Sequence, residues 1–136
     1  MENEFTDAER TATTVLVGLA GPSGGGKTLS ALRLASGLAQ GGDVGFVDTE
    51  SRRGLHYADR FRFKHMDMRA PFTPERFGVI VKKAEAANLK VLIIDSFSHE
   101  WDGDGGLVEW AEQLEATGGY ENRGIKSPGN WAKPKQ

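Results

Sequence analysis

The sequence predicts an α/β fold built around a mainly parallel sheet. Short apolar runs alternate along the chain with segments whose apolar residues recur at helical spacing, which is typical of strands joined by helices. The runs at 15–20 and 90–96 are nearly continuously apolar, as strands buried on both faces of a parallel sheet are. The chain has 136 residues, of which 38% are hydrophobic, and this suits a single domain with a modest core.

The chain divides into three regions by composition. Residues 1–13 lack apolar periodicity and are expected to form a flexible lead-in, with a short helix from Asp7 as the alternative. Residues 14–117 hold the alternating pattern and are predicted to be the folded domain. Residues 118–136 are rich in Gly, Pro and Asn and are predicted to be an irregular tail.

In the first half of the domain, "VLVGLA" at 15–20 is expected to be a buried strand, followed at once by a glycine-rich stretch. A helix is expected from Lys27, and the glycines of "QGG" at 40–42 end it. Segments 43–50 and 61–68 are expected to be the second and third strands. The helical spacing from Lys27 rests on Leu29, Leu32, Leu34, Ala35 and Leu38.

In the second half, Thr73 is the expected N-cap of a helix and Pro74 its first residue. Segment 90–96 is expected to be a buried strand, and 107–116 a further helix. The apolar stripe of the helix from Pro74 is formed by Phe77, Ile80, Val81 and Ala84.

Composition excludes several classes of protein. With 17 basic and 19 acidic residues, the chain has no basic excess of the kind that coats nucleic acid. The absence of cysteine excludes disulfides, thiolate metal sites and cysteine nucleophiles, and it fits a reducing cytosol. The acidic, polar start does not resemble a signal peptide, and no run approaches the roughly 18 apolar residues of a membrane span. We therefore expect a cytoplasmic protein without a membrane partner.

The stretch "GPSGGGKT" carries the strongest signal for function. It fits the Walker A pattern G-x-x-x-x-G-K-[ST] in the strand, loop and helix context that the pattern requires. The glycines let backbone N–H groups surround phosphate oxygens at the positive end of a helix. Lys27 would reach the β- and γ-phosphates of ATP, and the Thr28 hydroxyl would coordinate Mg²⁺. The predicted binding residues are Gly21, Pro22, Ser23, Gly24, Gly25, Gly26, Lys27, Thr28 and Leu29.

Two acidic residues at strand ends complete the predicted site. Asp95 follows four apolar residues and would hold Mg²⁺ as a Walker B aspartate, although an apolar strand also commonly ends in aspartate for structural reasons. Glu50, in "FVDTES" at the end of a neighbouring predicted strand, would orient or deprotonate the attacking water. Asp48 is a competing candidate for that role, and a solvated loop acid is the structural alternative.

Other features have structural and functional interpretations side by side. The stretch 51–65 mixes arginines with aromatic residues, which fits either a surface for single-stranded nucleic acid or an edge strand with one buried aromatic face. The three histidines are too scattered for a zinc site. His99 would either sense the γ-phosphate or serve as a cap or packing residue. Trp101 and Trp110 are expected to anchor the last helix to the core.

The order "GPSGGGKT", "FVDTE", "LIIDS" resembles the RecA-like branch of P-loop ATPases, and more closely the AAA-annotated ATP-binding proteins of bacteriophages and prophages, over about residues 15–110. The resemblance implies a three-layer P-loop NTPase fold and Mg²⁺-dependent ATP hydrolysis. It implies that Glu50 is catalytic together with Lys27 and that Asp95 binds Mg²⁺. It further implies a role in phage DNA recombination or single-strand annealing, with single-stranded DNA or a recombination protein as partner, in the cytoplasm of a bacterial host.

The end of the chain departs from that family. In the RecA-like architecture a later strand lies between the Walker A and Walker B strands, but the residues after Ala116 contain no apolar run long enough to supply it. The chain resembles the N-terminal part of a longer member, so we expect a sheet that is incomplete at its C-terminal end. Either the two motif strands close up, or a gap with exposed edges remains and favours a homo-oligomer.

Two other functions stay open. A small-molecule phosphoryl-transfer kinase would share the phosphate loop, with "DTESRRG" contributing to acceptor binding. A nucleotide-binding module without turnover is the other alternative. A GTPase is disfavoured because the sequence has no N-K-x-D segment.

Overall fold

The computed structural model describes residues 14–116, which form an α/β fold around a parallel sheet. The expected helix from Asp7 and the tail at 118–136 lie outside the described residues. The sheet contains β1 (Val44–Asp48), β2 (Lys64–Asp67) and β3 (Val91–Asp95) in the order β2-β1-β3, all parallel. Each lies within a segment predicted to be a strand. The register places Asp48 beside both Asp67 and Asp95, so the carboxyl ends of the three strands coincide.

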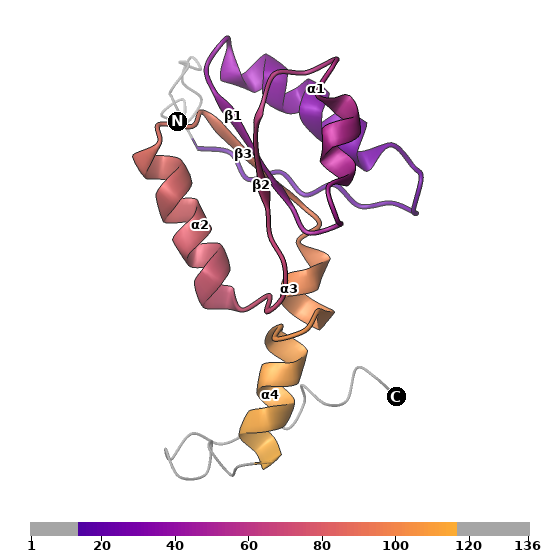
Figure 1. The fold of residues 1–136 in the computed structure, drawn as a ribbon, viewed down its shortest axis with the longest axis vertical. Helices are drawn as coiled ribbons and strands as arrows, with labels where there is room; N and C mark the ends of the chain where they lie inside the picture. Colours follow the sequence, from indigo (N-terminus) through magenta and orange to yellow (C-terminus); the bar gives the residue numbers. More distant parts are fainter. Residues whose placement is uncertain (1–13, 117–136) are drawn as a thin grey trace, which may run out of the picture.

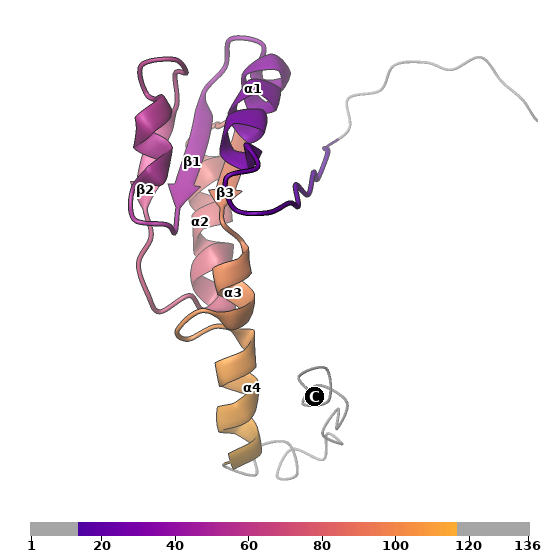
Figure 2. The ribbon, with the colours of Figure 1, turned by 90° about the vertical axis from the view of Figure 1, so that its right-hand side faces the viewer.

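Helices cover both faces of this sheet, and together they make three layers (Figure 1 and Figure 2). On one face, α1 (Lys27–Ala39) buries Leu32 and Ala35 against Phe46 of β1. On the other face, α2 (Pro74–Ala86) buries Phe77 and Ile80 against Val47. The two halves of the core therefore meet at β1, whose five residues are all buried.

The predicted start of α2 is confirmed, and so is its apolar stripe except at Val81, which is 41% exposed. Thr73 is the N-cap and its side chain accepts a hydrogen bond from the backbone N–H of Arg76. Pro74 is the first helical residue, where its missing N–H has no intrahelical partner to lose. Helix α2 is thereby fixed at the start of the segment that leads to β3.

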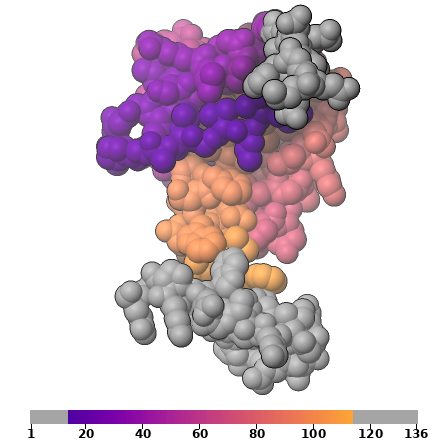
Figure 3. All heavy atoms as spheres, turned by 180° about the vertical axis from the view of Figure 1, so that it is seen from behind, coloured from indigo at the N-terminus to yellow at the C-terminus, as the bar shows by residue number. Residues whose placement is uncertain are grey.

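The predicted strand at 15–20 is not found. Residues 14–20 form no regular element and are exposed throughout, with Leu16 99% and Val15 64% exposed. A strand is stable only where a neighbouring strand supplies hydrogen bonds, and within the described residues β3 pairs with β1 alone. The sheet keeps a gap here, and the indigo start of the described chain lies on the surface in the space-filling view (Figure 3).

A cavity of about 480 Å³ occupies this gap, and we refer to it as the open slot. One wall is the segment 15–19, and the other is the free edge of β3 with the residues that follow it. Leu34 and Leu38 of α1 also line it and are 41% and 51% exposed, so the predicted apolar stripe of α1 is only partly buried. The open slot has the place and the apolar lining that a further strand would need.

Strand β2 is an edge strand, as the structural interpretation of 51–65 predicts. Phe61 and Phe63 pack against the core cluster of α1, whereas Arg62 and Lys64 are exposed. The segment therefore has a buried aromatic face and a charged solvent face.

Two short helices were not predicted, the 3-10 helix η1 (Arg53–Tyr57) and α3 (Ser98–Asp102). Helix α4 (Leu107–Ala116) matches its prediction, but it packs on α3 and extends away from the sheet (Figure 1). The expectation that Trp101 and Trp110 anchor this helix to the core is wrong, because the two residues are 46% and 49% exposed. Among the described residues, no helix is long and apolar enough to cross a membrane.

Candidate functional site

The glycine loop between residues 21 and 26 folds back on itself before α1 begins. The Gly25 N–H donates to the carbonyl oxygen of Pro22 at 3.1 Å. Gly26 is the N-cap of α1 with a φ of 81°, a left-handed conformation that glycine adopts without a steric penalty. The Lys27 ammonium donates to the carbonyl oxygens of Gly21 and Pro22 at 2.8 and 2.9 Å. The loop therefore curls around the end of the lysine side chain.

Thr28 and Asp95 meet at the carboxyl end of β3. The Thr28 hydroxyl donates to Asp95 Oδ2 at 2.5 Å, across 67 positions of sequence. Hydroxyl and carboxylate oxygens are ligands that suit Mg²⁺, which usually takes only one or two protein groups and completes its shell with water and phosphate oxygens. Within residues 14–116 no group of three or more His, Asp or Glu side chains could hold a metal ion. Thr28 and Asp95 are therefore the residues that could hold Mg²⁺ if phosphate and water supplied its other ligands.

Asp48 and Glu50 lie two residues apart but have different surroundings. Asp48 is 1% exposed and accepts the backbone N–H groups of Glu50 and Gly54, each at 2.8 Å. Burial alone would raise the pKa of Asp48, but these hydrogen bonds and the contact with His65 outweigh it and hold the pKa below its ordinary value. Asp48 therefore organises the loop after β1, whereas the Glu50 side chain is left to face the loop at 21–26.

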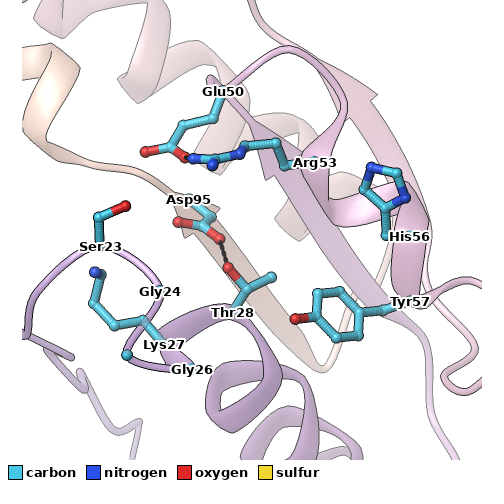
Figure 4. Close-up of a pocket in the computed structure, with 11 residues that line it drawn as sticks. Ser23, Gly24, Gly26, Lys27, Thr28, Glu50, Arg53, His56, Tyr57 and Asp95 are labelled. Carbon is cyan, nitrogen blue, oxygen red and sulfur yellow. Dashed lines mark hydrogen bonds and ion pairs between the residues drawn. The ribbon is translucent and has the colours of Figure 1, made fainter.

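A single cavity of about 490 Å³ brings most of the predicted site residues together (Figure 4). The glycine loop forms one side and Asp95 its floor, and Glu50 faces the loop from across the cavity. Gly21 and Pro22 take part through their carbonyl groups on Lys27, and Leu29 does not line the cavity. The lining residues are Ser23, Gly24, Gly25, Gly26, Lys27, Thr28, Glu50, Arg53, His56, Tyr57 and Asp95.

Three lining residues were not predicted to belong to the nucleotide site: Arg53, His56 and Tyr57, all from η1 (Figure 4). The sequence offered Arg53 and Tyr57 only for acceptor or nucleic-acid binding. The Arg53 Nη1 atom lies 2.7 Å from Glu50 Oε2, and this bond and the carboxylate charge raise the pKa of the Arg53 guanidinium. The signal in the sequence was the spacing of Arg53 and His56, which are three positions apart and so one turn of a 3-10 helix, with Tyr57 next to His56.

His99 does not line this cavity, and its side chain contacts Thr49 and Phe72 instead. Its Nδ1 atom is 2.9 Å from the Thr49 hydroxyl, and its ring packs on Phe72 with centroids 4.9 Å apart. The Thr49 hydroxyl also accepts the Ser96 N–H at 2.7 Å. The capping and packing interpretation of His99 therefore fits the structure, and this network joins the residues after β1 to those after β3.

Comparisons with known proteins add no relative to this picture: no family model, no curated protein and no solved structure matches the chain.

Proposed function

We propose that this chain binds ATP with Mg²⁺ and hydrolyses the bond to the γ-phosphate, and that its fold is of the RecA-like P-loop class. One observation carries the proposal. The glycine loop, the Thr28–Asp95 pair and Glu50 come from separate segments of the chain, yet they line one cavity of about 490 Å³. A loop for phosphate, oxygen ligands for a divalent cation and a carboxylate facing both are the parts that phosphoryl transfer to water requires.

Each side chain has a role that its position supports. Lys27 would exchange the two carbonyl oxygens it now contacts for β- and γ-phosphate oxygens, and the loop N–H groups would bind the same anion. Thr28 and Asp95 would hold Mg²⁺, which neutralises charge on the phosphates. Water would form a bond to the γ-phosphorus while the bond to the shared β-γ oxygen breaks, and Glu50 would take the water proton.

Tyr57 supplies a surface for the nucleoside. Its half-buried ring packs in part against the core cluster of α1, and unlike Phe61 and Phe63 it also lines the cavity, on the far side from the glycine loop (Figure 4). Aromatic rings bind nucleobases by stacking, which is tolerant of base identity. The phosphates at the loop and the base at Tyr57 would together span the cavity.

Binding is tested by titrating the chain with a fluorescent ATP analogue, with and without Mg²⁺. We expect Mg²⁺-dependent binding that Lys27→Ala weakens by a factor of about 10 to 100, because a charge-assisted contact to phosphate is lost. Lys82→Ala on the exposed side of α2 is the matched control and should bind as the unchanged chain does. Equal affinity in the Lys27→Ala variant would refute the site.

Turnover is tested by measuring phosphate release. Glu50→Gln should keep ATP binding and lower the rate by at least about 100-fold, since a positioned general base contributes that much. Glu85→Gln, an exposed acid on α2, is the control. An unchanged rate in Glu50→Gln would exclude this residue as the base. ADP release that depends on an added acceptor molecule would favour the kinase alternative.

A DNA-directed role rests on the sequence resemblance. Phe61 and Phe63 pack into the core, so in the stretch 51–65 these two rings are not free to stack on bases. Its exposed arginines remain available for phosphate contacts, which position nucleic acid without reading its sequence. Single-stranded DNA or a recombination protein stays a proposed partner on that basis.

A further inference from the structure

The ion pair between Glu50 and Arg53 lies in the candidate site but has no role in the chemistry described so far. The guanidinium Nη1 atom and the carboxylate Oε2 atom are 2.7 Å apart, and both side chains line the cavity (Figure 4). A carboxylate oxygen that accepts a hydrogen bond from a guanidinium has less room to accept one from water. While this pair persists, Glu50 is held back from water.

The balance of charge in the cavity indicates a second partner for Arg53. The cavity lining contains two carboxylates, Glu50 and Asp95, and two permanent cations, Lys27 and Arg53. ATP with its Mg²⁺ brings about two net negative charges into this space. Lys27 can contact the phosphates, and among the described residues Arg53 is the other permanent cation of the cavity lining.

The pair is also easily exchanged. The Arg53 side chain is 67% exposed and that of Glu50 is 34% exposed, and ion pairs this accessible to water contribute little to stability. A terminal phosphate carries more charge than a carboxylate and accepts two parallel N–H bonds from a guanidinium. Phosphate is therefore the stronger partner wherever both are within reach.

We propose that Arg53 is a positioning residue that exchanges Glu50 for the γ-phosphate when ATP binds. The exchange adds a cation to the terminal phosphate and at the same time releases the Glu50 carboxylate to orient water. ADP has no γ-phosphate, so with ADP the guanidinium remains on Glu50. The inference rests on the proposed function, and it makes Arg53 the residue that distinguishes ATP from ADP.

The first test compares ATP and ADP affinities, measured in Mg²⁺ by displacement of a fluorescent nucleotide. Arg53→Gln should weaken ATP binding by a factor of about 10 to 100 and change ADP binding by less than about twofold. Arg53→Lys should restore part of the ATP affinity. Arg52→Gln is the matched control, since the neighbouring arginine pairs with Asp67 and does not line the cavity. An unchanged ratio of ATP to ADP affinity in Arg53→Gln would overturn the inference.

The second test measures the coupling between the two side chains. Glu50→Gln removes the competing carboxylate and should tighten ATP binding severalfold in the presence of Arg53. That gain should vanish when Arg53→Gln is added. A gain that persists in full in the double variant would show that it comes from the charge of Glu50 alone and would refute the exchange.

These outcomes separate the two proposals. If the chain binds nucleotide in a Lys27-dependent manner but Arg53→Gln leaves the affinity ratio unchanged, the exchange is wrong and the proposed function stands. If the chain binds no nucleotide, or binds it equally well with Lys27→Ala, both proposals are wrong.

Discussion

Asp48 illustrates how a buried charge shapes the site without belonging to it. The carboxylate receives two backbone N–H groups from the loop that it precedes, and so fixes Glu50 and Gly54. Gly54 must be small as well, because a Cβ atom there would lie 2.4 Å from the Phe46 ring. The start of η1, and with it the position of Arg53, therefore depends on Asp48 and Phe46, which do not line the cavity.

We expect Asp48 to make stability dependent on pH in the acid range. Its folded pKa is lowered, so the charged form contributes stability that is present above the ordinary value of 3.8 and is lost as the pH falls through the folded pKa. At neutral pH, Asp48→Asn should lower the free energy of unfolding by about 1–3 kcal/mol. The NH₂ group of the asparagine side chain would replace one carboxylate oxygen and would face a backbone N–H donor that then has no acceptor. Chemical denaturation over a pH series measures the difference.

The difference in unfolding free energy between Asp48→Asn and the unchanged chain should shrink below about pH 4. There the Asp48 carboxyl group becomes protonated, first in the unfolded chain and at lower pH in the folded chain. Asp43→Asn is the control: this residue is paired with Lys64 at 2.8 Å on the surface, and its loss should not move the midpoint of unfolding at neutral pH. A difference that is constant down to pH 2 would mean that the charge of Asp48 does not stabilise the fold.

At this residue scale, motifs were predictable and the remaining contacts were not. The spacing of Gly26, Lys27 and Thr28 is local, so a sequence pattern contains all of it. Arg53 and Tyr57 line the cavity because the 3-10 helix η1 is held by a hydrogen bond to Asp48 and by close packing of Gly54 on Phe46. Neither of these tertiary contacts can be predicted from a local sequence pattern.

At the scale of elements, predictions succeeded where the local sequence includes its own signals. Helix α2 has its N-cap Thr73 followed by Pro74, and β1 is an apolar run that the core surrounds. The apolar run of β3 also forms a strand, but of its residues only Ile93 is buried and the others are half-buried. The run at 15–20 is apolar like the first four residues of β3, yet it forms no strand. Apolar composition indicates that a segment tends to be buried, whereas a strand also requires hydrogen bonds to a neighbouring strand, and the open slot separates the segment 15–19 from the free edge of β3.

At the scale of the whole molecule, the open slot leaves apolar surface in contact with water. Leu16, Leu34 and Leu38 are exposed around it, and the free edge of β3 adds unpaired backbone groups. Exposed apolar patches beside a free sheet edge are typical sites of association. We therefore expect the chain to self-associate through this face.

Sedimentation velocity over a concentration series tests this expectation. Leu34→Lys places a charge in the open slot and should shift the chain towards monomer. Val79→Lys is matched to it, since Val79 is an aliphatic residue of α2 that is 49% exposed and distant from the slot, and it should leave association unchanged. A monodisperse monomer with a cooperative melt in the unchanged chain would contradict the expectation.

The two walls of the open slot continue directly into the two halves of the proposed phosphate site. The segment 15–19 leads into the glycine loop, and β3 ends at Asp95, the partner of Thr28. A strand that entered the slot would therefore fix the separation between the loop and the carboxylate. Thermodynamic linkage makes such an effect reciprocal: if filling the slot raises the affinity for nucleotide by some factor, nucleotide raises the affinity of the slot for its strand by the same factor.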